Sequence, residues 1–300
     1  MRSCLTFILI IILTLTGCVR SDDEEQDGLS ASEIHEMTMH SDALEKDMKM
    51  SVYLPKGYSS SAKYPVLYII HGYSGSYSDS FTYWDINKTA DRLIAEGKIE
   101  PVIIVSPQLD NSFGINSSVE ASSMDGDDPQ YARYEGRYED YIMQELLPFI
   151  DEQFSTSADK EHRWIGGISM GGFISLHTAF RHPASFSKVG GHSPALYLDH
   201  QTGYSSVIRW LYPDEEARAA RDPLQLAKSA NLEGMEIYLD CGDKDGYQFY
   251  QGAAKLDELL KKRQLQSEYH LYPGEHDHEY WRTHLEEYLL FYAGTKESMN

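Results

Sequence analysis

The chain has 300 residues with 26 Lys or Arg against 47 Asp or Glu, which gives a formal net charge of −21. Proteins that bind nucleic acid present basic surfaces to its phosphates, so this charge argues against a nucleic-acid partner. Aromatic residues make up 12% of the chain and supply large side chains for a folded core. Cys241 is the one cysteine after Cys18, which excludes a structural disulfide or a cysteine-based zinc site in the folded part.

The amino terminus has the features of a targeting segment. The apolar run from Leu5 to Leu15 is about half as long as a membrane-spanning helix, and it has the length of a signal-peptide core. It ends in Leu15-Thr16-Gly17-Cys18, which resembles the lipobox of bacterial lipoproteins, in which the cysteine is lipidated after cleavage. We therefore expect residues 1–17 to be a lipoprotein signal peptide and Cys18 to carry the lipid; an ordinary secretory signal is the alternative. This predicts a lipid-anchored protein of the bacterial cell envelope, at the outer membrane or cell surface.

A short acidic segment and one domain are expected to follow. Residues 18–32 include Ser21-Asp22-Asp23-Glu24-Glu25-Gln26-Asp27-Gly28, which cannot bury apolar surface and is typical of a solvated tether. Residues 33–293 contain no second charge run, internal repeat or Pro/Gly-rich linker, and their length fits one α/β domain.

Short apolar runs alternate with helical patterns across this domain, which indicates βαβ units and a mainly parallel sheet with helices on both faces. The expected strands are residues 49–54, 65–70, 102–105, 164–168, 188–191, 235–240 and 268–271, with residues 34–40 pairing antiparallel to the first. The expected helices are residues 84–95, 138–153, 170–181, 248–262 and 280–292.

A serine lies where one of these strands is expected to turn into a helix. Gly167-Ile168-Ser169-Met170-Gly171 fits the pattern G-x-S-x-G, with strand-like residues before it and helix-like residues after it. This is the context of a nucleophile elbow, in which the glycines permit the sharp turn and the serine hydroxyl is exposed. A glycine-rich turn with an ordinary serine is the alternative.

A serine nucleophile needs a base, and in this arrangement the acid and then the histidine follow it in the chain. Among the eight later histidines, His276 and His278 lie in the loop after the last expected strand, and we favour His276 because it is nearer the strand end. Asp243 and Asp245 both lie in the loop after the preceding strand, and the residues themselves do not decide between them as the acid.

The remaining component is a pair of backbone donors for the carbonyl oxygen. Ile69-Ile70-His71-Gly72-Tyr73 ends another strand, and we expect the N–H groups of Tyr73 and Met170 to form an oxyanion hole, with His71 in a packing role. The loop at Asp243 is similar to a calcium loop, but Cys241 and Gly252 would then have to be its first and last ligands. We expect no metal and no cofactor.

Together these residues resemble the esterase branch of the α/β-hydrolases. The branch includes feruloyl and acetyl xylan esterases of carbohydrate esterase family 1, S-formylglutathione hydrolase, enterochelin esterases and the antigen 85 mycolyltransferases. The resemblance covers residues 34–292 and also rests on Tyr64-Pro65-Val66-Leu67-Tyr68, Leu146-Leu147-Pro148-Phe149-Ile150 and Gly274-Glu275-His276-Asp277. It implies an α/β-hydrolase fold, with Asp245 as the acid at the end of Cys-Gly-x-x-Asp and His276 as the base in Gly-x-His before Trp281. The chain departs from the branch at Tyr73-Ser74-Gly75-Ser76, where a more glycine-rich run is usual.

The resemblance implies a serine carboxylic-ester hydrolase that acts through an acyl-enzyme. A lipid-tethered enzyme that faces outward meets polymers first, so we expect it to remove feruloyl or acetyl groups from polysaccharides or oligosaccharides. The alternatives are a siderophore trilactone esterase, a thioesterase similar to S-formylglutathione hydrolase, and a surface glycan-binding lipoprotein without activity. Residues 110–137 either form a rim of the substrate cleft or are an ordinary surface loop.

Overall fold

The computed structural model of this chain describes residues 28–117, 135–198 and 205–295. The expected signal peptide, the lipidated Cys18 and most of the expected tether lie outside these residues. None of the helices within the described ranges combines the length and the apolar character that crossing a bilayer requires.

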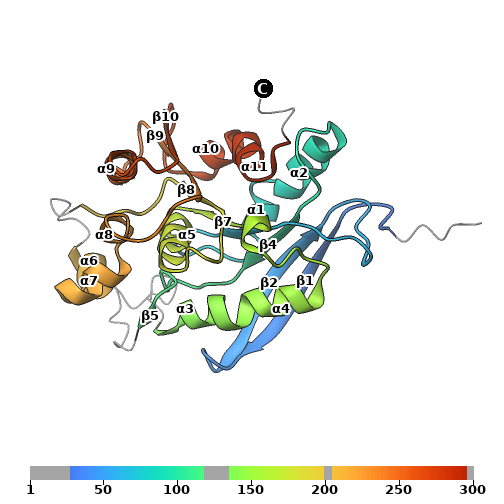
Figure 1. The fold of residues 1–300 in the computed structure, drawn as a ribbon, viewed down its shortest axis with the longest axis horizontal. Helices are drawn as coiled ribbons and strands as arrows, with labels where there is room; N and C mark the ends of the chain where they lie inside the picture. The colour runs from blue at the N-terminus through green and yellow to red at the C-terminus, as the bar shows by residue number, and fades with distance from the viewer. Residues whose placement is uncertain (1–27, 118–134, 199–204, 296–300) are drawn as a thin grey trace, which may run out of the picture.

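Eight strands form one sheet in the order β1-β2-β4-β3-β7-β8-β9-β10 (Figure 1). β1 pairs antiparallel with β2, and β2 pairs antiparallel with β4, whereas every other neighbouring pair is parallel. This confirms the α/β-hydrolase prediction of a mainly parallel sheet with antiparallel amino-terminal strands, and each of the eight expected strands is present. Their bounds are β1 Glu33–Ser41, β2 Lys46–Leu54, β3 Val66–Ile70, β4 Ile103–Pro107, β7 Arg163–Ile168, β8 Lys188–His192, β9 Glu236–Gly242 and β10 Ser267–Tyr272.

Both faces of the sheet are covered, and the side chains of β3 show this directly. Leu67 and Ile69 join the core on one face, while Tyr68 and Ile70 join the core on the other. The first face packs on α2 (Ile86–Ala95), α10 (His278–Thr283) and α11 (Leu285–Ala293), and the second on α3 (Tyr138–Asp140), α4 (Leu147–Gln153), α5 (Met170–Arg181) and α9 (Phe249–Lys262). Figure 1 shows α2, α10 and α11 gathered along one side of the sheet and α3 and α4 along the other. A parallel strand that is buried on both faces consists of apolar residues throughout, and β3 is such a strand.

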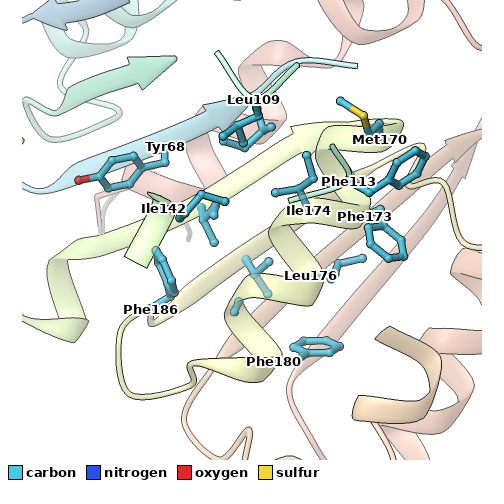
Figure 2. Close-up of a cluster of buried hydrophobic side chains, with 14 of the residues drawn as sticks. Tyr68, Leu109, Phe113, Ile142, Met170, Phe173, Ile174, Leu176, Phe180 and Phe186 are labelled. Carbon is cyan, nitrogen blue, oxygen red and sulfur yellow. The ribbon is translucent and has the colours of Figure 1, made fainter. Parts of the chain in front are cut away.

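Helix α5 is the centre of the larger core. Eleven of its twelve residues, Met170 to Phe180, are buried. Figure 2 shows Phe173, Ile174, Leu176 and Phe180 projecting from this helix among aromatic and aliphatic side chains of its neighbours. Tight packing around the helix fixes the position of its amino-terminal end, which Ser169 directly precedes.

The expectation of one α-helix over residues 138–153 is wrong in its middle. The segment runs as α3, a π-helical stretch from Tyr141 to Leu146, and α4. Pro148 explains the change, because it has no N–H to donate and its ring crowds the carbonyl group four residues earlier, so the chain takes a wider turn before it. Its apolar side chains still face the core through the wider turn, since Tyr138, Tyr141 and Ile142 are all buried.

Other helix limits differ from the expected ones. Helix α2 begins at Ile86, because Asp85 adopts a left-handed conformation with φ 53°. The expected helix over residues 280–292 is two helices, α10 and α11, which meet at His284; α10 begins early because the Asp277 side chain accepts a hydrogen bond from the N–H of Tyr280. Several short elements were not expected: α1 Asp79–Thr82, β5 Asn116–Ser117, β6 Gly136–Arg137, α6 Ser205–Leu211, α7 Glu215–Arg221 and α8 Pro223–Leu226.

Candidate active site

Ser169 lies at the sharp turn between β7 and α5, and its backbone is strained. Its φ of 53° is a left-handed value that residues with a side chain rarely adopt. Two hydrogen bonds hold the turn: Ser169 N–H donates to the carbonyl oxygen of His192 (2.9 Å), and its own carbonyl accepts from Ala195 N–H (2.9 Å). Backbone strain of this kind persists only where the surroundings enforce it, and the end of β8 does so here.

The two motif glycines are required by close backbone approach. A Cβ atom on Gly167 would lie 2.6 Å from the carbonyl carbon of Gly171, and a Cβ atom on Gly171 would lie 2.6 Å from the carbonyl oxygen of His71. Since nothing but hydrogen fits at these distances, the pattern G-x-S-x-G here reflects the geometry of an elbow.

The structure brings Ser169, His276 and Asp245 into one hydrogen-bonded chain. Nε2 of His276 is 2.9 Å from Oγ of Ser169, and Nδ1 of His276 is 2.9 Å from Oδ2 of Asp245. A carboxylate only accepts hydrogen bonds, so Nδ1 carries the imidazole proton and Nε2 presents a lone pair to the serine hydroxyl. Residues that are 107 positions apart in the chain thus meet at the carboxyl ends of β7 and β10.

Asp245 is held by its own loop and is nearly inaccessible. Its second oxygen, Oδ1, accepts from the N–H of Tyr247 (2.7 Å), and Oδ2 also accepts from the thiol of Cys241 (3.3 Å). Burial raises the pKa of that thiol far above its ordinary value, and the neighbouring Asp245 adds to the shift. Cys241 is therefore a buried hydrogen-bond donor and not a reactive thiol.

Asp243, the other candidate for the acid, points elsewhere. Its Oδ1 accepts from the N–H of Gly274 (3.0 Å), so it ties the loop after β9 to the loop that carries His276. His278, the other candidate for the base, accepts a hydrogen bond from Nε1 of Trp84 through its Nδ1 (2.9 Å). The structure thus places Asp245 and His276 together and leaves Asp243 and His278 outside the chain of hydrogen bonds that begins at Ser169.

The two expected oxyanion donors border the serine. Met170 is the first residue of α5, so its N–H is one of the helix's first-turn donors without an intrahelical acceptor. Tyr73 follows the end of β3 and lines the same cavity as Ser169. His71 is buried between two backbone groups: Nε2 accepts from Leu109 N–H (3.1 Å), so Nδ1 donates to the carbonyl of Gly72 (2.8 Å). Burial lowers the pKa of His71, which keeps it neutral in the packing role expected of it.

A second histidine–aspartate pair lies behind the site and is fully buried. Nδ1 of His192 donates to Oδ1 of Asp240 (2.8 Å), and Oδ2 of Asp240 accepts the hydroxyl groups of Tyr280 (2.7 Å) and Tyr288 (2.8 Å). The hydroxyl of Tyr292 lies 3.2 Å from the remaining His192 nitrogen. These partners satisfy the pair internally, so it is a structural network of the fold.

Ser169 and His276 open into a cavity of about 960 Å³. One wall, the buried wall, consists of Phe113, Tyr197 and Phe249, whose rings form a continuous series with centroids 6.5 and 5.5 Å apart. Each of the three side chains is at most 6% exposed. The patterns in the sequence did not identify these residues, although Phe113 falls in the stretch 110–137 considered as a possible rim.

A second wall, the open wall, consists of Tyr83 and His278, which are exposed, and of Trp281, which is 5% exposed. The Tyr83 and His278 rings stack with centroids 4.8 Å apart, and Trp281 contacts both His278 (5.5 Å) and His276 (5.0 Å). Tyr83 is 52% exposed. His276 also contacts Phe249 (5.4 Å), so the imidazole stands between the two walls.

The site contains no evident metal centre. Within residues 28–117, 135–198 and 205–295, no group of three or more His, Cys, Asp or Glu side chains is arranged to hold a metal ion.

Comparison with known proteins gives several relatives. An endo-1,4-beta-xylanase/feruloyl esterase of Xylanibacter ruminicola is 30% identical over 188 residues, which are 60% of this chain and 24% of that protein. An S-formylglutathione hydrolase of Arabidopsis thaliana is 27% identical over 271 residues, 86% of this chain and 91% of that one. A solved CE1 ferulic acid esterase from Anaeromyces mucronatus, in complex with ferulic acid, superposes with a TM-score of 0.69 at 23% identity and covers 92% of this chain and 95% of its own.

The family comparison covers most of the domain. Residues 41–292 match the family described as "Putative esterase". This range contains the elbow, both loops of the hydrogen-bonded chain and the two cavity walls. The chain therefore belongs to the putative esterase family of α/β-hydrolases.

Proposed function

We propose that this chain is a serine carboxylic-ester hydrolase that removes feruloyl or acetyl groups from carbohydrate through an acyl-enzyme. The observation that carries the proposal is the chain of hydrogen bonds from Ser169 through His276 to Asp245 at the wall of an open cavity. A feruloyl esterase, an acetyl esterase of Caldicellulosiruptor saccharolyticus and a ferulic acid esterase structure among the relatives support it.

The reaction follows from the orientation of the imidazole. Nε2 of His276 takes the proton of Ser169 while Oγ attacks the ester carbonyl, and the negative charge on the carbonyl oxygen meets the N–H groups of Met170 and Tyr73. His276 then gives the proton to the alcohol oxygen as the C–O bond breaks, which leaves the acyl group on Ser169. Water repeats the same steps and releases the acid, while Asp245 keeps the imidazole in the productive tautomer.

The charge of the cavity favours a neutral substrate over the two rival esters. Its described lining includes the carboxylates of Asp79 and Asp277 and neither Lys nor Arg. S-formylglutathione carries two carboxylates, and a ferric catecholate trilactone is also anionic, so both need cationic partners for tight binding. An esterified neutral sugar needs none. Because an S-formylglutathione hydrolase of Arabidopsis thaliana is among the relatives, hydrolysis of a glutathione thioester is the second candidate function.

Active-site labelling tests whether the protein is an enzyme of this class. A fluorophosphonate probe is expected to label the wild-type protein and not Ser169→Ala, because only an activated serine attacks it. The labelled band is read by in-gel fluorescence, with Ser175→Ala as a control, since Ser175 is a buried serine of the same helix whose hydroxyl donates to a backbone carbonyl. Equal labelling of Ser169→Ala, or none of the wild type, contradicts the proposal and leaves the glycan-binding alternative.

We further propose that Cys18 carries a lipid that anchors the enzyme in the bacterial envelope. The support is the sequence Leu15-Thr16-Gly17-Cys18 after the apolar run. In cells, Cys18→Ala is expected to leave unprocessed precursor or to release protein from the membrane fraction, which fractionation and immunoblotting detect. Cys4→Ala is the matched control, because Cys4 precedes the apolar run. Membrane association of Cys18→Ala equal to that of wild type argues against the anchor.

A further inference from the structure

The open wall of the cavity has the composition of a sugar-binding surface. Among the described residues, four large hydrophobic side chains are exposed, namely Ile34, Tyr83, Tyr247 and Leu271; Tyr83 belongs to the open wall, whereas the Tyr247 ring lines the cavity stacked on Phe249 (5.4 Å). Tyr83 stacks on His278 with an interplanar angle of 28°. An exposed aromatic face at the mouth of a site offers apolar contact to the C–H face of a sugar ring.

The hydrogen bond from Trp84 fixes what His278 can offer to a ligand. An indole N–H can only donate, so Nδ1 of His278 is an acceptor, and the neutral imidazole carries its proton on Nε2. No described residue is hydrogen-bonded to Nε2 of His278. His278 therefore presents a fixed N–H donor beside the Tyr83 ring. This pairing of an apolar face with a hydrogen-bond donor suits a ring that carries hydroxyl groups.

The chemistry of the reaction determines which part of the substrate reaches this wall. The carbonyl oxygen of the ester must face the N–H groups of Met170 and Tyr73, and the Tyr73 ring contacts Phe113 of the buried wall (6.1 Å). The leaving oxygen must lie at Nε2 of His276, which protonates it. The His276 ring contacts both Phe249 of the buried wall (5.4 Å) and Trp281 of the open wall (5.0 Å), so the exposure of the two walls decides which of them takes the acyl group and which takes the alcohol.

The exposure of the two walls favours the acyl group at the buried wall and the alcohol at the open wall. The side chains of the buried wall are at most 6% exposed, which suits a small or planar acyl group. The open wall meets solvent at Tyr83, so a sugar bound there can extend into an oligosaccharide or polysaccharide.

We infer that Tyr83 and His278 form the subsite that binds the sugar next to the scissile ester, with Tyr83 stacking on the ring and Nε2 of His278 donating to one of its oxygens. This inference rests on the proposed function, and it adds the residues that distinguish a sugar ester from a simple alkyl ester.

The test compares two esters of the same acid. The ratio of kcat/KM for a feruloylated arabinose-containing trisaccharide to that for methyl ferulate is measured in each variant. Tyr83→Ala is expected to lower this ratio about five- to tenfold, the size of effect that one aromatic contact gives. Tyr83→Phe keeps the ring and should keep the ratio within about twofold of wild type. His278→Phe keeps the stacked ring and removes the donor, so it should lower the ratio about five- to tenfold, the effect of one hydrogen bond.

Leu271→Ala is the matched control, because Leu271 is equally exposed and lies on β10 outside the cavity lining. It should not change the ratio. An equal loss on both esters in Tyr83→Ala, or an unchanged ratio in both Tyr83→Ala and His278→Phe, overturns the subsite while the esterase proposal stands. Absence of turnover of both ferulates and of p-nitrophenyl acetate by the wild-type protein overturns the proposed function instead, so the two failures are distinguishable.

Discussion

Asp245→Asn is expected to lower kcat about 10⁴-fold on every ester that the enzyme hydrolyses, the size of effect that the wrong imidazole tautomer produces in a serine triad. The Asn side chain can still accept from Tyr247 N–H, but its amide donates to Nδ1 of His276 where the carboxylate accepted. The imidazole proton then moves to Nε2, which no longer accepts from Ser169. Steady-state hydrolysis of p-nitrophenyl acetate measures the loss, and the rate of fluorophosphonate labelling should fall with it.

Asp243→Asn is the control for this experiment, because it makes the same chemical change two residues earlier. The Asp243 carboxylate accepts from the backbone N–H of Gly274, and an amide oxygen can do the same. We therefore expect a loss of less than about tenfold, since a neutral acceptor replaces a charged one in a single hydrogen bond. A larger loss in Asp243→Asn than in Asp245→Asn would reverse the two roles.

The sequence was sufficient for the elbow because the elbow is a local structure. β7, the turn and α5 are consecutive in the chain, and the close approaches of Gly167 and Gly171 leave a visible pattern of glycines. His276 could be placed because it follows the last strand of the sheet, where the chain order of this fold puts the base. The choice of Asp245 over Asp243 needed the resemblance to a family, since both carboxylates lie in one loop and only the turn geometry decides which of them faces His276.

The cavity walls could not be predicted because they have no local signature. Phe113, Tyr197 and Phe249 come from three separate segments, and each in isolation is an apolar residue that any core could hold. Tyr83 follows the short helix α1, and nothing around it in the sequence indicates a site. Its role becomes visible only in the structure, where His278, almost two hundred residues later, stacks on it. The π-helical stretch before Pro148 was likewise missed, because an apolar stripe at helical spacing persists through a wider turn.

Asp240→Ala is expected to reduce the free energy of unfolding by about 3–5 kcal/mol, the cost of removing one partner from a buried polar network. The Asp240 side chain is fully buried and accepts three hydrogen bonds, from His192, Tyr280 and Tyr288. Alanine leaves these three donors in an apolar interior without an acceptor and opens a cavity beside them. Urea unfolding measures the loss, and the melting temperature should fall by roughly 10 °C.

Tyr288→Phe provides the graded control, since it removes one hydroxyl and leaves Asp240 with its other two donors. It should cost only about 1 kcal/mol, the net value of one hydrogen bond. Equal stability of Asp240→Ala and Tyr288→Phe would show that the network does not act as a unit.

The position of the network also predicts its effect on activity. The Tyr280 ring lies so close to Gly274 that a Cβ atom there would come within 2.5 Å of it, and Gly274 begins the loop that carries His276. Asp240→Ala should therefore reduce the order of the His276 loop as well as the stability of the fold. As a result, kcat should fall as the measurement temperature approaches the lowered melting temperature. Asp245→Asn should instead lose kcat at every temperature below unfolding. The loss of kcat should therefore depend on temperature in Asp240→Ala and not in Asp245→Asn, although the two carboxylates are only five residues apart. Asp245 controls the proton on His276, whereas Asp240 holds the helix that packs against the loop of His276.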